Sequence, residues 1–128
     1  MSSAAFDPLD FPRDLLDAQR HLTALYAQLH ALQARLPWSR EAHPGWEEET
    51  ERGRQRPGRP ATDGWTADEA AEYDRLWEKL RTVAAVVDCH PHWIRCKEAG
   101  TGELAARQAL KHADGAVPVD QGAVTTAA

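Results

Sequence analysis

The chain has 128 residues, a size typical of one domain, and 42% of them are hydrophobic, which is enough to fill a small core. Its formal net charge of −5 argues against a general nucleic-acid binder, because neutralising phosphates requires a basic face. The N-terminus lacks the basic and apolar regions of a secretion signal, and no stretch reaches the roughly 18 apolar residues of a membrane span. We therefore expect a cytoplasmic protein without membrane contact.

The first predicted helix covers residues 9–36 and carries the strongest pattern in the sequence. It begins at Asp7 before Pro8 or at Asp10 before Pro12, and it ends before Pro37. Its apolar residues alternate spacings of three and four, as the a and d positions of a heptad repeat do. They are Leu15, Ala18, Leu22, Leu25, Leu29, Leu32 and Leu36. This stripe needs an apolar partner.

A second heptad helix is predicted over residues 66–90. Thr66 and Glu69 have the spacing of an N-terminal capping box, and Trp65 stands where a hydrophobic staple would lie. The apolar stripe is widened by Trp77 and Val86 and is formed by Tyr73, Leu76, Leu80, Val83, Val87 and His90. Both helices together predict an all-α fold whose centre is an antiparallel, coiled-coil-like helical hairpin.

The connection between the two helices, residues 37–65, is predicted to be a long loop. It contains repeated prolines and glycines, and a glutamate run from Glu47 to Glu51 precedes the arginines Arg52, Arg54, Arg56 and Arg59. Loops of this length are functional or disordered, and a disordered linker is normally poor in tryptophan. Trp38 and Trp46 therefore favour a loop that folds back on the hairpin.

Two short helices are expected after the hairpin. Pro91 disfavours continuation of the second helix, so a new helix is predicted over residues 91–99 and a last one over 103–113, beyond the Gly-Thr-Gly break. Residues 114–128 hold little that can be buried and are interpreted as a flexible tail. The prediction is thus a single helical domain over residues 7–113.

A cysteine and histidine cluster at the kink suggests a metal site. Cys89, His92 and Cys96 are ligand types that zinc accepts, but the second pair of ligands usual in structural sites is missing. The alternative is that both cysteines are ordinary small apolar residues and that the histidines cap helices or face solvent. No catalytic motif is apparent, so we expect no enzyme activity and no cofactor other than this zinc alternative.

Two features raise DNA binding as an alternative. Arg56 and Arg59 flank a Pro-Gly pair and precede Pro60, a partial match to short arginine hooks that enter the minor groove. The two short C-terminal helices have the outline of a helix-turn-helix, with Arg107 and Lys111 among the candidate reading residues. The acidic run beside the arginines would repel phosphate, so nucleic acid is not the expected partner.

The five tryptophans exceed the usual share for this length. At interfaces, tryptophan supplies a large contact area with few rotamers to immobilise. Trp38, Trp46 and Trp93, together with Arg56 and Arg59, are the predicted partner-binding residues. The alternative for the tryptophans is packing of the loop on the hairpin.

These observations predict a non-catalytic, helical protein-interaction or regulatory accessory module. Its partner would be another protein or a second copy, because heptads on both helices suit a homodimeric four-helix bundle. The alternatives are a small metal-binding protein using the Cys89 to Cys96 cluster and a DNA-binding regulator.

Overall fold

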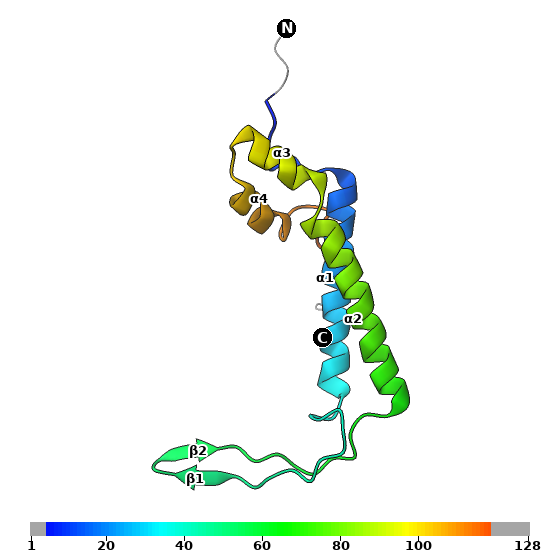
Figure 1. Ribbon diagram of the computed structural model, residues 1–128, viewed down its shortest axis with the longest axis vertical. Coiled ribbons are helices and arrows are strands. Elements are labelled where there is room, and N and C mark those ends of the chain that lie inside the picture. Colours follow the sequence, from blue (N-terminus) through cyan, green and yellow to red (C-terminus); the bar gives the residue numbers. More distant parts are fainter. Residues whose placement is uncertain (1–4, 119–128) are drawn as a thin grey trace, which may run out of the picture. The chain divides into compact units, whose positions relative to one another are not determined.

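The computed structural model describes residues 5–118 and is mostly helical with one small two-stranded sheet (Figure 1). Its elements, in chain order, are α1 (Arg13–Arg35), β1 (Glu49–Glu51), β2 (Arg54–Arg56), α2 (Ala67–Asp88), α3 (Pro91–Ala99) and α4 (Glu103–Leu110). The helical part of the predicted fold is confirmed. The all-α prediction is wrong for the connection between α1 and α2, because that segment contains the sheet. Within the described residues, the helices are all too short or too polar to cross a membrane.

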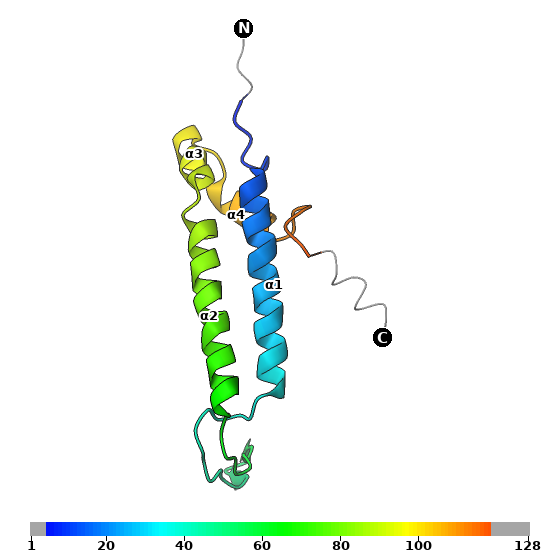
Figure 2. The ribbon, with the colours of Figure 1, turned by 90° about the vertical axis from the view of Figure 1, so that its right-hand side faces the viewer.

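The described chain divides into two compact units. Unit 1 contains residues 5–28 and 78–118, and unit 2 contains residues 29–77. Each of the two long helices therefore contributes one part to each unit. Within each unit, the parts of α1 and α2 lie side by side with opposite chain directions (Figures 1 and 2).

The helix boundaries follow local chemistry. The predicted first helix is too long at its start, because Asp7 and Asp10 form a turn and α1 begins only after Pro12. The capping box of α2 is confirmed: the Thr66 amide donates to Glu69 Oε1 (2.8 Å), and the Glu69 amide donates to Thr66 Oγ1 (3.1 Å). Such a cap stabilises a helix by about 1 kcal/mol.

The core of unit 1 is assembled from all four helices. It consists of Leu15, Val87, Trp93, Cys96, Ala106, Leu110 and Ala116. Val86 is 52% exposed, so its predicted place in the apolar stripe is wrong. Ala116, in the segment interpreted as a tail, is also buried in this core. Residues 119–128 of that tail lie outside the described part of the chain.

In unit 2, the helical parts bury Leu29, Leu32 and Leu76. Trp65 packs against Tyr73 of α2, with ring centroids 4.8 Å apart. A contact between Trp65 and α2 is what the predicted hydrophobic staple requires. Arg40 makes two hydrogen bonds of 2.8 Å to the carboxylate of Asp74, and this partner raises the pKa of the guanidinium. These contacts fix the start of the segment that follows.

Residues 40–65 form an extended antiparallel ribbon, here called the arm (Figure 1). His43 pairs with Thr62, Trp46 with Arg59 and Glu49 with Arg56, so each step of three residues along one strand is matched by three residues back along the other. In the pairs His43–Thr62 and Trp46–Arg59, each amide nitrogen lies 2.8–2.9 Å from the carbonyl oxygen of its partner. The predicted loop is therefore a single, in-register β-structure.

Two glycines allow the arm to form. Gly53 follows Arg52 at the tip, and both have positive φ (77° and 52°), the requirement of a type I′ turn joining two strands. At Gly45, also with positive φ (74°), a Cβ atom would lie 2.3 Å from the Arg59 carbonyl oxygen of the opposite strand. A side chain at this position would push the strands apart.

Candidate functional site

A compact aromatic cluster is formed by His43 and Trp46 of the arm and by Trp38, which precedes the arm. Their ring centroids are 4.9–5.8 Å apart, and the rings meet edge to face. In a regular strand, residues three apart point to opposite faces. Gly45, with its positive φ, breaks that alternation and lets the rings of His43 and Trp46 meet. His43 is the member of this cluster that the sequence analysis did not single out.

Indole N–H groups fix Trp38 and Trp46 to proline carbonyls. Trp46 Nε1 donates to the Pro57 oxygen (3.1 Å), and Trp38 Nε1 donates to the Pro60 oxygen (2.7 Å). The Trp46 bond crosses the ribbon and helps to hold its two strands together, whereas the Trp38 bond ties the second strand to the segment that precedes the ribbon. Trp46 as a whole is nevertheless 50% exposed. Trp46 is thus both a structural residue of the arm and a large, fixed apolar surface in contact with solvent.

The arginines of the arm lie beside an aromatic ring or opposite glutamates. Arg59 places its guanidinium 5.7 Å from the ring centre of Trp38, within the range of a cation–π contact. Arg56 stands directly opposite Glu49, and Arg54 stands opposite Glu51. The basic and acidic halves of the segment therefore occupy facing positions of the ribbon, so this surface carries both signs of charge.

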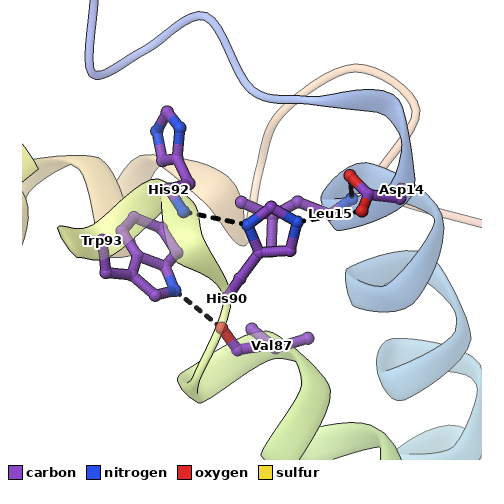
Figure 3. A network of polar contacts seen from close by, with 6 residues as sticks. All are labelled: Asp14, Leu15, Val87, His90, His92 and Trp93. Carbon is purple, nitrogen blue, oxygen red and sulfur yellow. Dashed lines mark hydrogen bonds and ion pairs between the residues drawn. The ribbon is translucent and has the colours of Figure 1, made fainter. Parts of the chain in front are cut away.

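Trp93 is the predicted partner-binding residue that the structure contradicts. It is 3% exposed in the core of unit 1, and its indole N–H donates to the Val87 carbonyl oxygen at 2.6 Å (Figure 3). Arg107 covers one face of the ring, with its guanidinium carbon 4.5 Å from the ring centre. Trp93 therefore joins α2 to α3 and is not available as a binding surface.

His90 links three segments of unit 1 (Figure 3). Its Nδ1 accepts a hydrogen bond from the His92 amide (3.0 Å) and caps α3, as the sequence analysis allowed for a capping histidine. The neutral ring then carries its proton on Nε2, which donates to Asp14 Oδ2 (3.1 Å) on α1. This bond lowers the pKa of the Asp14 carboxyl. His90 therefore has a structural role, because it connects the start of α3 to α1.

The proposed zinc ligands are not brought together. Cys89 is exposed, whereas Cys96 is buried in the core, where burial raises the pKa of its thiol. His92 is 1% exposed, its Nε2 donates to the Pro8 carbonyl oxygen (2.8 Å), and Phe6 and Phe11 flank its ring. Across residues 5–118, no group of three or more His, Cys, Asp or Glu residues has the arrangement of a metal site. The metal-binding hypothesis therefore has no structural support.

Arg107 does not have the freedom of a DNA-reading side chain. Its Nε donates to Glu103 Oε2 (3.0 Å), and one terminal nitrogen donates to the Asp88 carbonyl oxygen (3.3 Å) at the end of α2. These bonds and the contact with Trp93 use the guanidinium inside unit 1. The helix-turn-helix interpretation of α3 and α4 loses its central candidate.

Comparison with known proteins identifies the family. A family described as a domain of unknown function (DUF8825) matches residues 14–113, so this chain belongs to that family. The match includes the arm, Trp93 and every described helix and strand apart from the first residue of α1, and it ends before the core residue Ala116. No curated protein and no solved structure matches the chain.

Proposed function

We propose that the protein is a non-catalytic, helical protein-interaction or regulatory accessory module and that the arm is its binding surface. The partner is another protein or a second copy of the chain. The half-exposed position of Trp46 is the observation that carries this proposal, because an indole bond and backbone pairing fix its ring before any partner arrives. A fixed aromatic surface loses little conformational entropy on binding.

The edges of the arm are also suited to selective binding. Its two open edges carry charged side chains, as natural edge strands do to avoid unspecific pairing with other strands. A partner would therefore bind through the aromatic cluster and through Arg59 at its side. The opposed charges of Glu49 and Arg56 would form the polar rim around this cluster.

We further propose that the heptad positions of α1 and α2 pack as a coiled-coil-like antiparallel hairpin. The burial of Leu25 and Leu80 in unit 1, and of Leu29, Leu32 and Leu76 in unit 2, supports this packing. The hairpin is then the scaffold that presents the arm. The cytoplasmic location predicted from the sequence is part of the same proposal.

The proposal is tested by comparing the association of the full wild-type chain with that of a variant altered on the arm surface. Light scattering over a range of concentrations reports self-association, and quantitative affinity capture from the native host reports another partner. We expect Trp46→Ala to reduce association about tenfold or more, as hot-spot tryptophans do. Ile94→Ala is the matched control, because Ile94 is also exposed (57%) but lies on α3.

A second variant separates a lost contact from a lost arm. Arg59→Ala leaves both indole bonds in place, and amide exchange at His43 and Thr62 reports whether the ribbon persists. We expect weakened association with retained amide protection. If Trp46→Ala and Arg59→Ala associate as strongly as the wild-type chain, the arm is not the binding surface.

A further inference from the structure

Unit 1 contains a groove that the proposed function does not use. It has a volume of about 530 Å³ and lies between α1, the end of α2 and α4. Its floor includes the buried side chains of Val87, Trp93 and Leu110. Small-molecule sites have volumes of about 300–1,000 Å³ and mostly apolar linings with a few polar groups. The size and the floor of this groove both meet that description.

One wall of the groove contains a buried polar side chain. Gln19 is only 8% exposed, and its Nε2 donates to Thr23 Oγ1 (3.2 Å). The Thr23 hydroxyl in turn donates to the Gln19 carbonyl oxygen (3.0 Å), so the amide is held in one orientation. These hydrogen bonds of Gln19 use its Nε2 and its backbone carbonyl, and its Oε1 is not enclosed away from solvent. A ligand N–H or O–H group in the groove would therefore reach this acceptor.

On the opposite wall, the arginine side chain already contacts other residues of unit 1. Arg107 is fixed by Glu103, by the Asp88 carbonyl and by the ring of Trp93, so it acts as a rigid side of the groove. Lys111, which follows α4, also lines the groove and is exposed. Asp88 lines the groove as well, and its carboxylate lies 4.0 Å from a terminal nitrogen of Arg107. The cations Arg107 and Lys111 therefore outnumber this carboxylate in the lining, which favours a negatively charged ligand group on the Lys111 side.

Two exposed apolar side chains complete the lining. Leu104 on α4 is 72% exposed, and Tyr26 on α1 is 41% exposed. Both belong to the large hydrophobic residues that folding leaves in contact with water. A ligand with an apolar body would cover part of this surface, which is the main source of binding free energy for small molecules.

We propose that this groove binds a small amphipathic organic anion. The ligand would have an aromatic or branched apolar body over Tyr26 and Leu104, one hydrogen-bond donor for Gln19 Oε1, and a carboxylate or sulfonate group near Lys111. This proposal stands independently of partner binding by the arm, because the groove belongs to unit 1 and the arm to unit 2.

The probe for the test is 8-anilinonaphthalene-1-sulfonate, which combines an apolar ring system, an N–H donor and a sulfonate. Titration into the native full-length chain is expected to give saturable binding of one molecule per chain. In ¹⁵N NMR spectra, the shifted signals are expected to include the side-chain amide of Gln19 and the backbone amides of Leu104 and Lys111. Shifts confined to other surfaces, or no binding at millimolar probe, would overturn the proposal.

Matched variants test the two chemical requirements. Lys111→Glu and Leu104→Ser are each expected to weaken probe binding by about tenfold, equivalent to about 1.4 kcal/mol. Lys97→Glu and Ile94→Ser, at exposed positions of α3 away from the groove, are expected to leave affinity unchanged. All four positions are exposed, so these variants should fold. Equal affinity in the Lys111 and Lys97 variants would contradict the anion, and equal affinity in the Leu104 and Ile94 variants would contradict the apolar contact.

Discussion

Unit 1 buries Trp93, Leu15 and Leu110 in a shared core, whereas the arm of unit 2 leaves nearly all of its side chains exposed and is ordered by backbone pairing. An isolated two-stranded ribbon is only marginally stable in water. In unit 1, apolar burial determines how the chain folds. In the arm, indole bonds to proline carbonyls and a type I′ turn have this role. Changes that damage one region should therefore differ in kind from changes that damage the other.

The largest effect is expected from Trp93→Ala. This change removes the ring from the core of unit 1 and leaves the Val87 carbonyl without its indole donor. Truncation of a buried tryptophan typically destabilises a protein by about 3–5 kcal/mol. Urea unfolding followed by circular dichroism measures the loss. Ile94→Ala, the exposed neighbour, is the control, and equal stabilities of the two variants would contradict the assigned core.

The next effect is local to the arm. Gly45→Ala places a Cβ atom against the opposite strand and forces a positive φ on alanine, which costs about 1–2 kcal/mol before the clash is counted. We expect the amides of His43 and Trp46 to lose protection from exchange while those of unit 1 keep theirs. Gly102→Ala is the control, since its nearest neighbour would be Ala105 Cβ at 3.6 Å. Unchanged protection in Gly45→Ala would contradict the close approach of the strands.

A smaller effect is expected at the start of α2. Thr66→Ala removes the hydroxyl that accepts the Glu69 amide, and loss of such a cap costs about 1 kcal/mol. Denaturant unfolding measures the change. Thr82→Ala is the matched control within α2, because the Thr82 hydroxyl bonds only the preceding helical turn and alanine favours helix. The capping role would be refuted if both threonine variants had the stability of the wild type.

The smallest effect concerns pH. His90 donates to the Asp14 carboxylate and lowers its pKa below the ordinary value of 3.8. The contribution to stability is therefore present above about pH 4, the unfolded pKa, and is lost as pH falls through the lower folded pKa. The side chain of Asp14 is 77% exposed, so solvent screening keeps the effect small. Asp14→Asn should flatten the acid limb of a stability–pH curve, and an unchanged curve would contradict this link between α1 and α3.

The helices could be predicted from the sequence because their signals are local. The Thr66 and Glu69 spacing, and the proline at the start of α3, each specify a helix boundary through neighbouring residues alone. The ribbon was missed because its strands lack alternating apolar residues and contain prolines, which usually argue against strands. The Arg52-Gly53 pair between a Glu-Thr-Glu and an Arg-Gln-Arg segment was the available signal for a two-residue hairpin.

The candidate sites were predictable only in part. Trp46, Arg56 and Arg59 lie on the arm and Trp38 contacts it from the segment just before, because all four belong to one continuous stretch of sequence. For Trp93 and the Cys-His cluster the sequence left alternatives open, because burial depends on which face of α3 meets α1 and α4, and sequence spacing does not specify that face. The groove lined by Gln19 and Lys111 arises from helices far apart in the chain, so no local pattern indicates it.

The central claim is that the arm is an ordered surface built by backbone pairing. Hydrogen exchange of the amides of His43, Trp46, Arg59 and Thr62 tests it most directly, since these amides form the cross-strand bonds outside β1 and β2. We predict exchange at least about tenfold slower than in an unstructured peptide, which is the signature of a hydrogen-bonded structure. Exchange of all four amides at the unstructured rate would contradict the ribbon, and with it the proposed binding surface.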